Sequence, residues 1–411
     1  MERKFIETEL GRIPSDWIVT TIKDAGTAIT DGINPQKYRE SEFCEYSMPA
    51  YDCGMSPNIC KGSSMNSNRT KISGEVLLFN KLNVRQRRVW YVENAPANSV
   101  CSMEFLAYKS NVICLPLLRE ILLQDKVTND FISVSRGTSN SQKRIAPSDF
   151  WNYKVAVPAD IKEQQRIASC LSAMNDMILK LSDVIEKKRR IKEGLMLQLL
   201  TGKIRLPGFS GDWKEMTLGE CAMIKARIGW QGLTTAEYLD SGNYFLITGT
   251  EIENGKVSWN RCHYVSKERF LQDKNIQICQ GDVLITKDGT IGKVAYLDTI
   301  PGDGTLNSGV FVVRSKDNSL LQEYMAYVFL SRYFNDFIDK IVAGSTITHL
   351  YQKDIINFAF PIPPSIEEQK AISQIITAVD NEIQTIEYKR NKYVDLKQGM
   401  MQQLLTGKTR L

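Results

Sequence analysis

The sequence predicts a mixed α/β (α+β) protein made of two similar globular domains and two long helices, which pair as an antiparallel intramolecular coiled coil. The main observation is a repeat without gaps, because segment 161–206 returns as segment 366–411. Glu163 corresponds to Glu368, and the offset of 205 residues (368 − 163) also relates the two Leu-Leu-Thr-Gly-Lys sequences near the segment ends. A repeat of this length decides the architecture before any single motif does, and it predicts pseudo-two-fold symmetry.

Each copy has the apolar spacing of a long helix that pairs with another helix. Apolar residues recur in alternating steps of three and four, which is the heptad pattern of a coiled coil. The predicted seam consists of Ile167, Leu171, Met174, Ile178, Leu181, Ile372, Ile376, Val379, Ile383 and Ile386. About 39 residues at about 1.5 Å each give a rod of roughly 58 Å. Such a stripe can also be ordinary core, but its length and duplication favour the coiled coil.

The two globular parts share a frame as well. Each begins with a proline turn and an Asp-Trp pair, at Trp17 and Trp213, and each ends with a strand that is followed by proline. We interpret the two tryptophans as core anchors at the domain edge. The predicted globular domains are 1–157 and 206–362, and the predicted helical segments are 158–205 and 363–411.

The composition is that of an ordinary globular protein. With 43% hydrophobic and 24% charged residues and a net charge of +5, the chain allows a nucleic-acid partner but does not require one. Its nine cysteines are irregularly spaced and form no Cys-x-x-Cys pair, which indicates reduced thiols. The sequence has neither a signal-like apolar N-terminus nor a run of eighteen apolar residues, so we expect a cytoplasmic protein without membrane spans.

Motifs for catalysis are scarce. The two histidines, His263 and His349, lie in neither a metal-ligand nor a triad spacing, and no Gly-x-Gly-x-x-Gly sequence, methyltransferase motif or nuclease carboxylate cluster is present. Gly407-Lys408-Thr409 resembles the end of a phosphate-binding loop, but Gln402 stands where that loop has glycine. The sequence therefore predicts no catalytic residues and no metal site, and the Gly-Lys pair is interpreted as a helix C-cap.

Polar loops that could bind DNA are better represented. Arg, Lys, Asn and Gln side chains read base edges, while Ser and Thr hold phosphates. The candidates in the first half are Lys81, Arg85, Arg87, Arg88, Arg136, Ser139, Asn140, Gln142, Lys143 and Arg144. Those in the second half are Lys225, Arg227, Gln231, Lys287, Thr290, Lys293, Ser345, Thr346, Thr348 and His349. The alternative for these charged stretches is a solvated loop, and for His349 a structural role is slightly preferred.

Two further features fall in the predicted helices. Gly194 and Gly399 occupy matching places, and glycine destabilises a helix interior by roughly 1 kcal/mol. We therefore expect each glycine to mark a close approach between the two helices. The basic run 187–190 is interpreted as a solvated face of the coiled coil and is not assigned to DNA.

Taken together, these motifs resemble the specificity subunit of Type I restriction–modification systems. The resemblance rests on the Glu-Leu-Gly-Arg-Ile-Pro-Ser-Asp-Trp sequence at 9–17, on segment 281–293, on Gly344-Ser-Thr, on the Pro-x-x-Ile-x-Glu-Gln helix starts and on the two Leu-Leu-Thr-Gly-Lys sequences. It covers essentially the whole chain. The first half departs from the pattern, because the strand at 74–79 lacks the Lys-Asp-Gly-Thr-Ile-Gly continuation.

The resemblance implies two target recognition domains, each reading one part of a split DNA sequence, with the long helices as spacer. It implies no catalysis in this chain. Two methyltransferase subunits would use S-adenosylmethionine to methylate adenine at N6, and restriction subunits would use ATP and Mg²⁺ to translocate and cleave DNA. The residues alone also allow a coiled-coil scaffold whose globular halves bind proteins. A stand-alone nuclease or methyltransferase is disfavoured by the missing motifs.

Overall fold

The structure is a computed structural model that describes residues 4–137, 139, 142–229, 232–343 and 349–411. The chain divides into two compact units. Unit 1 comprises Met1–Leu181 and Lys389–Leu411, and unit 2 comprises Ser182–Tyr388. Each unit therefore contains one globular part and a portion of both long helices. The domain limits expected from the sequence stay a prediction.

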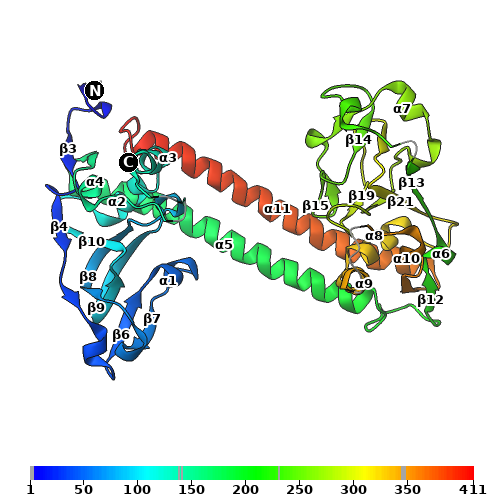
Figure 1. Cartoon of the computed structure of the whole chain (residues 1–411), viewed down its shortest axis with the longest axis horizontal. Coiled ribbons are helices and arrows are strands. Elements are labelled where there is room, and N and C mark those ends of the chain that lie inside the picture. Colours follow the sequence, from blue (N-terminus) through cyan, green and yellow to red (C-terminus); the bar gives the residue numbers. More distant parts are fainter. Residues whose placement is uncertain (1–3, 138, 140–141, 230–231, 344–348) are drawn as a thin grey trace. The chain divides into compact units, whose positions relative to one another are not determined.

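Unit 1 is built on a seven-stranded sheet in the order β4-β10-β8-β9-β6-β7, with β5 paired to β8 (Figure 1). Its strands are β4 (Gly26–Ile29), β5 (Gly32–Ile33), β6 (Glu42–Tyr46), β7 (Asn58–Lys61), β8 (Arg69–Asn80), β9 (Val89–Ser102) and β10 (Phe105–Ser110). Alternate residues of β8 enter different cores. Leu77 and Phe79 belong to the core that the helices share, whereas Val76 and Leu78 belong to a second core with Trp90.

The remaining elements of unit 1 close the globular part and cover the sheet. They are β1 (Phe5–Thr8), β2 (Gly11–Pro14), β3 (Trp17–Thr21), β11 (Lys154–Pro158), α1 (Met48–Asp52), α2 (Leu115–Leu122), α3 (Asp125–Val134) and α4 (Pro147–Trp151). β3 pairs antiparallel with β11, so strands from the two ends of the globular part meet directly before the long helix begins. The ring centre of Phe79 lies 4.5 Å from that of Phe150, on which it stacks, and 5.1 Å from that of Phe131. These contacts fix α3 and α4 to β8.

Unit 2 contains smaller sheets than unit 1, and its central strand corresponds in sequence to the central strand of unit 1. The sheets of unit 2 are β13-β21-β18-β19, β17-β14-β20, β15-β16 and β12-β22. The strands are β12 (Lys214–Thr217), β13 (Ala222–Ala226), β14 (Phe245–Ile247), β15 (Ile252–Glu253), β16 (Lys256–Val257), β17 (His263–Tyr264), β18 (Val283–Thr286), β19 (Val294–Tyr296), β20 (Gly304–Leu306), β21 (Val310–Ser315) and β22 (Ala359–Ile362). The short helices are α6 (Leu218–Cys221), α7 (Lys267–Leu271), α8 (Gln322–Leu330), α9 (Arg332–Ala343) and α10 (Gln352–Ile355). β18 is buried on both faces, as β8 is near its end.

In unit 1, the central strand begins differently from the prediction. The sequence predicts a turn at Gly74 and at Gly281, each followed by a buried strand. Gly281 is such a turn, with φ +90°, and β18 follows it. Gly74 instead lies inside β8 with φ +65°, where the pairing with β9 shifts register on both sides of it. A glycine with positive φ serves a turn or a β-bulge equally well, and here it forms a bulge.

The two long helices are α5 (Ile161–Leu199) and α11 (Ile366–Leu404), each of 39 residues. Within unit 1, Leu171 from the first part of α5 shares a core with Leu404 from the end of α11. Within unit 2, Leu199 from the end of α5 shares a core with Ile372 from the start of α11. The helices therefore run antiparallel in each unit (Figure 1). The predicted seam residues that are buried are Ile167, Leu171, Ile372, Ile376 and Ile383, and those that are half-buried are Met174, Ile178, Leu181, Val379 and Ile386.

A buried glutamine fastens the start of α5 to the globular part of unit 1. Gln164 is 1% exposed, and its side-chain oxygen accepts a hydrogen bond from the Cys114 amide at 2.8 Å. Its side-chain nitrogen donates to the carbonyls of Val112 at 3.0 Å and Pro158 at 2.8 Å. One side chain thus satisfies backbone groups on three sides of the junction, and each such group left unpaired in the interior would destabilise the fold.

Gln369 makes the equivalent contacts in unit 2. Its oxygen accepts from the Leu321 amide at 2.7 Å, and its nitrogen donates to the carbonyls of Ser319 at 2.8 Å and Pro363 at 3.2 Å. The glutamine of the repeated Glu-Gln motif therefore has the same structural task in both units.

The glutamate of that motif binds the end of the other repeat. In unit 2, Arg205 donates to Glu368 through two hydrogen bonds, at 2.9 and 2.8 Å. In unit 1, the equivalent Arg410 contacts Glu163 at 2.7 Å and also pairs with Asp16. Both glutamates are almost fully buried in the first turn of their helix, where the helix dipole favours a negative charge.

The predicted C-caps are confirmed and explain the two tryptophans. Gly202 and Gly407 both have φ +68°, the left-handed conformation that ends a helix. A Cβ atom would lie 3.2 Å from the Trp213 ring at Gly202 and 3.2 Å from the Trp17 ring at Gly407. The tryptophans therefore anchor the helix ends within the core of each unit.

The expectation that Gly194 and Gly399, near the helix ends, mark a close approach of the helices is wrong. Gly194 and Gly399 are exposed, and a Cβ atom at either position would meet nothing within 4 Å in the described part of the chain. The helices instead bury Met196, Leu199 and Leu404, which lie on a different face. Sequence spacing placed the glycines at matching positions, but it did not show that they face away from the seam.

The basic run forms part of the helix pairing in unit 2. Arg189 pairs with Glu387 at 2.7 Å, and Lys188 pairs with Glu382. Such exposed pairs contribute about 0–1 kcal/mol each, so they add little to the stability of the helix pairing. In the described part of the chain, no helix is both long and apolar enough to cross a membrane.

We predict that Gln369→Leu lowers the free energy of unfolding of unit 2 by about 2–3 kcal/mol, because the Leu321 amide loses its partner in the interior. Urea unfolding followed by circular dichroism measures the change. The matched control is Gln165→Leu, the same substitution at an exposed position of α5, which should leave the unfolding curve within about 0.5 kcal/mol of the wild type. Equal effects of the two substitutions would contradict the fastening role.

Candidate nucleic-acid interface

In unit 1, the structure brings together the two polar clusters that the sequence singled out. Leu82, directly after β8, forms an antiparallel β-bridge with Arg144. The Ile145 amide donates to the Lys81 carbonyl at 3.1 Å, and the Asn83 amide donates to the Lys143 carbonyl at 2.7 Å. The end of the central strand and the end of the loop after α3 therefore form one surface.

Unit 2 repeats this arrangement with other side chains. Asp288, after β18, forms the corresponding bridge with His349. The Leu350 amide donates to the Lys287 carbonyl at 2.8 Å. Leu350 and Ile145 are related by the same offset of 205 residues as the long helices, so the backbone framework belongs to the repeat.

One arginine in unit 1 stands on a short turn. The 3₁₀-helix η3 (Val84–Gln86) is flanked by Asn83 with φ +51° and Arg87 with φ +49°. Both residues adopt the left-handed conformation, which is uncommon for residues other than glycine and marks a tightly constrained backbone. Arg85 lies in this turn with an exposed side chain. The side chain of Arg85 is thus open to solvent.

The neighbouring arginines are held in ion pairs. Arg88 donates to both oxygens of Asp52, at 2.8 and 2.7 Å, and Arg87 pairs with Asp125 at 2.5 Å. The hydrogen bond from Arg88 lowers the pKa of the Asp52 carboxyl. These contacts fix the turn that carries Arg85, so we assign Arg87 and Arg88 a positioning role.

Arg144 is held in the same way, by Glu104 at 3.1 and 3.0 Å, and these hydrogen bonds raise the pKa of its guanidinium. Lys81 donates to the Met103 carbonyl at 2.9 Å. The other candidates described in unit 1 lie toward solvent: Arg136, Ser139 and Gln142 are exposed, and Lys143 is half-buried.

The loop after β18 in unit 2 is a tight turn. The Thr286 hydroxyl donates to the Thr290 carbonyl at 2.5 Å and accepts from the Lys293 amide at 2.9 Å. Gly289 and Gly292 have φ +68° and +83°, which this turn requires. The segment therefore forms a turn that exposes the Thr290 side chain.

Charged groups of opposite sign meet at this surface of unit 2. His349 Nδ1 is hydrogen-bonded to the Asp288 carboxylate, and its ring contacts Tyr351 edge-on at 4.7 Å. Lys287 Nζ lies 5.4 Å from the centre of the Phe311 ring. The mixture of anion, cation and hydroxyl differs from the arginine-rich surface of unit 1.

One candidate lies on β13 and another lies directly after it, and the two differ in exposure. Lys225 is exposed, whereas Arg227 is 2% exposed and donates to the Leu306 carbonyl at 2.9 Å and the Thr305 hydroxyl at 3.1 Å. Burial, and then the nearby Arg269, lower the pKa of the Arg227 guanidinium. A side chain enclosed in this way fits a structural role better than a DNA contact. The candidates Asn140, Gln231, Ser345, Thr346 and Thr348 lie outside the described residues.

Sequence reasoning missed the acidic residues that position the arginines. Asp52, Glu104 and Asp125 lie 36, 40 and 38 residues from their partners. It also missed Glu251 in unit 2, a buried carboxylate whose pKa burial alone would raise. Hydrogen bonds from Thr250 and Thr248 outweigh burial and lower that pKa. No local pattern marks such long-range partners.

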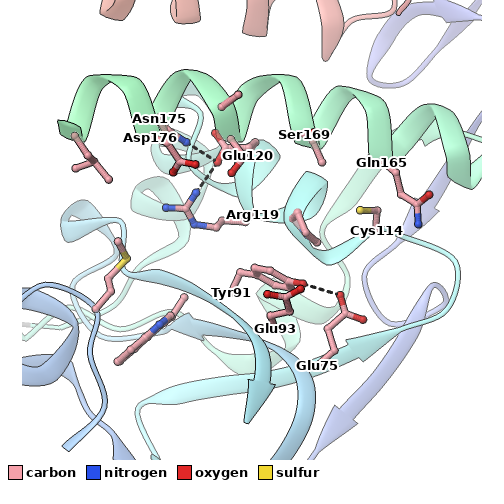
Figure 2. A pocket seen from close by; sticks show the side chains of 17 residues that line it. Glu75, Tyr91, Glu93, Cys114, Arg119, Glu120, Gln165, Ser169, Asn175 and Asp176 are labelled. Carbon is pink, nitrogen blue, oxygen red and sulfur yellow. Dashed lines mark hydrogen bonds and ion pairs between the residues drawn. The ribbon is translucent and has the colours of Figure 1, made fainter. Parts of the chain in front are cut away.

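A separate cavity in unit 1 has the wrong charge for DNA. It has a volume of about 720 Å³ and lies between β9, α2 and α5. Figure 2 shows Glu75, Glu93, Glu120 and Asp176 at its wall, with Tyr91 donating to Glu75 at 3.1 Å. Carboxylates repel phosphate, so we do not include this cavity in the interface.

We predict that Asp288→Ala loosens the bridge of unit 2, because His349 loses its hydrogen-bonded partner. The Leu350 amide should exchange its hydrogen roughly tenfold faster, since exchange reports local opening. Hydrogen–deuterium exchange measures this rate, and the equivalent Ile145 amide of unit 1 is the internal control. An unchanged rate at Leu350 would show that the backbone alone holds the bridge.

Known proteins are similar to this chain in sequence and in fold. A family model described as the type I restriction modification DNA specificity domain matches residues 210–395. The type I restriction enzyme MjaIX specificity subunit of Methanocaldococcus jannaschii is 23% identical over 409 residues, which cover 90% of this chain and 88% of the relative.

Solved structures agree with these sequence matches. A crystal structure of the type I restriction–modification S subunit from M. genitalium superposes with a TM-score of 0.62 at 15% identity, covering 98% of this chain and 99% of the other. A chain from a study of complex assembly and conformational transition of the type I R-M system gives a TM-score of 0.57 at 19% identity, covering 97% and 99%. At these identities the structures show a common fold. The sequence matches and the duplicated motifs together show that this chain is similar to Type I restriction–modification specificity subunits.

Proposed function

We propose that this chain gives a type I restriction–modification complex its DNA sequence specificity, and that each unit reads one part of a bipartite target. The observation that carries the proposal is the shared surface framework. A β-bridge joins the end of the central strand to the following loop in both units, at Leu82–Arg144 and Asp288–His349. Equivalent backbones with unlike side chains are what two readers of different sequences require.

The side chains favour an asymmetric target. Arg85 and Arg136 are cations that can bind guanine edges or phosphates, and Gln142 can pair with adenine. Unit 2 offers Lys287 and Thr290 beside the Asp288–His349 pair, which is a different set of donors and acceptors. Two unlike surfaces read two unlike half-sites.

The long helices suit a spacer role. Each has 39 residues, and at about 1.5 Å per residue such a helix is roughly 58 Å long. This length corresponds to about 17 base pairs at about 3.4 Å each, so the unread segment between two half-sites falls within its scale.

The chain also serves as a scaffold in this proposal. Methyltransferase subunits, two per chain, would bind S-adenosylmethionine and methylate adenine at N6. Restriction subunits would use ATP and Mg²⁺ to translocate and cleave the DNA. The chain itself would select the sequence without taking part in the chemistry, in the cytoplasm.

Binding to random duplex DNA tests this function. The full chain is mixed with a library of random duplexes, with and without a type I methyltransferase subunit, and the retained DNA is sequenced. We expect a split, asymmetric motif. No retained DNA under either condition would refute the proposal and favour the alternative of a coiled-coil scaffold whose globular halves bind proteins.

Arg85→Ala is predicted to weaken target binding by about 1–3 kcal/mol and, if the contact is to phosphate, to reduce the slope of log K against log salt by about 1. Fluorescence anisotropy over a salt series measures both quantities. Lys180→Ala, at an exposed position on α5, removes one charge away from the loops and should lower affinity far less. The same loss for both variants would indicate a general charge effect.

Ile178→Pro is predicted to abolish binding to the bipartite target, because proline in a helix interior costs about 3 kcal/mol or more and bends or breaks it. Ile178→Ala keeps the helix and is the control. Targets with altered spacer lengths report the effect. If Ile178→Pro retained the wild-type affinity and spacer preference, the helices would not set the spacing.

A further inference from the structure

One position of the β-bridge carries a nitrogen-bearing side chain in both units. Arg144 is the bridge residue of the loop after α3 in unit 1, and His349 is the bridge residue after α9 in unit 2. The offset between them is 205 residues (349 − 144), the same offset that relates the long helices. The two residues are therefore equivalent in the repeat, but their side chains differ in the hydrogen bonds that they can make.

A carboxylate holds the side chain at this position in each unit, and it comes from a different place in each. Arg144 donates from Nε and Nη2 to Glu104, which directly precedes β10. His349 is bound by Asp288, which lies two residues after the end of β18. A carboxylate that belonged to the common framework would occupy the same place in both units. Each unit instead fixes the orientation of this side chain by its own means.

Both side chains are open to solvent although they are held. The side chain of Arg144 is 51% exposed and that of His349 is 33% exposed, whereas the ion-paired Arg88 is only 15% exposed. The ring of His349 also contacts Tyr351, which restricts its rotation further. An exposed polar side chain with a fixed orientation loses little conformational entropy when it binds a ligand.

The free donors of Arg144 match guanine. A guanidinium has five N–H groups, and Glu104 occupies one on Nε and one on Nη2. Both N–H groups of Nη1 and the second one of Nη2 point away from this carboxylate. Such a fork pairs with the O6 and N7 acceptors that guanine presents in the major groove.

The free nitrogen of His349 matches a different class of base. The Asp288 carboxylate can only accept, so the proton lies on Nδ1, and the neutral imidazole then has its lone pair on Nε2. Within the residues that the structure describes, no hydrogen bond to Nε2 is made. In the major groove, the donors that an acceptor can bind are the amino groups of adenine and cytosine, because guanine and thymine present only acceptors there.

We propose that the position of Arg144 and His349 selects one base pair in each half-site. Arg144 reads guanine in the half-site of unit 1, and Nε2 of His349 accepts a hydrogen bond from the amino group of adenine or cytosine in the half-site of unit 2. Glu104 and Asp288 are positioning residues. The inference rests on the proposed function and names the position through which the two units select different bases.

Exchange of the two side chains tests the proposal. The full chain carrying His349→Arg, Arg144→His or both is mixed with the library of random duplexes under the condition in which the wild type retains DNA, and the retained DNA is sequenced. We expect His349→Arg to replace adenine or cytosine by guanine at one base pair of one half-site. Arg144→His should remove the preference for guanine at one base pair of the other half-site. Competition between the old and new targets should shift by roughly fivefold or more.

The chain offers a matched control for each exchange. His263 in unit 2 also lies beside a carboxylate, with Nδ1 4.0 Å from Asp240, but it is not part of the bridge. His263→Arg should therefore leave both half-sites unchanged. Arg39→His, at an exposed position of unit 1 outside the bridge, should do the same.

A second variant separates reading from folding. His349→Phe keeps a ring that can contact Tyr351 but removes Nε2. We expect it to lose the preference at the same single base pair that His349→Arg changes, to keep every other preference, and to unfold at the wild-type temperature.

The other outcomes each overturn the proposal. Exchange variants that keep the wild-type motif at every base pair would show that this position reads no base, while the split motif of the wild type would still support the proposed function. A uniform loss of affinity without any change in the preferred bases would identify a phosphate contact. Loss of one whole half-site by His349→Phe, together with a lower unfolding temperature, would identify a structural role. A wild type that selects no split motif would overturn the proposed function itself.

Discussion

The buried Glu-Gln pair at the start of each long helix is the interaction on which the rest of the structure depends. Its glutamine, Gln164 or Gln369, satisfies backbone groups of the globular part, and its glutamate receives the terminal arginine of the other repeat. One dipeptide thus joins the start of the helix to the globular part of its unit and to the end of the other repeat. Buried polar groups of this kind specify a single arrangement, because every alternative leaves them unpaired.

Because these buried groups and the backbone hold the framework, the side chains of the surface loops are not needed to maintain it. The bridge between the end of the central strand and the following loop is made by backbone groups, as the Ile145 and Leu350 amides show. Side chains at the bridge can therefore change without loss of the framework. In unit 1 they include arginines held by distant carboxylates, and in unit 2 they include the Asp288–His349 pair. A common scaffold with exchangeable side chains explains how one fold presents two unlike surfaces.

Much of the helical architecture could be predicted from the sequence, because a 205-residue offset and a heptad seam are periodic signals. The clusters around Lys81 and Arg144 were also visible, but not their junction, since β-bridges join residues that are far apart in the chain. Arg227 shows the limit for single side chains, because burial depends on the whole fold. The error at Gly194 has the same origin, since a repeat shows that two positions are equivalent without showing which way they face.

Unit 1 consists of two segments that are far apart in the chain, and this has a consequence for folding during synthesis. Unit 2 is one continuous segment, Ser182–Tyr388, whereas unit 1 needs both Met1–Leu181 and Lys389–Leu411. Arg410 must reach Glu163 across a separation of 247 residues. Domains usually fold in the order in which the ribosome releases them. Here the part that is synthesised first completes its core last, after Lys389–Leu411 has been translated, and unit 2 can fold in the meantime.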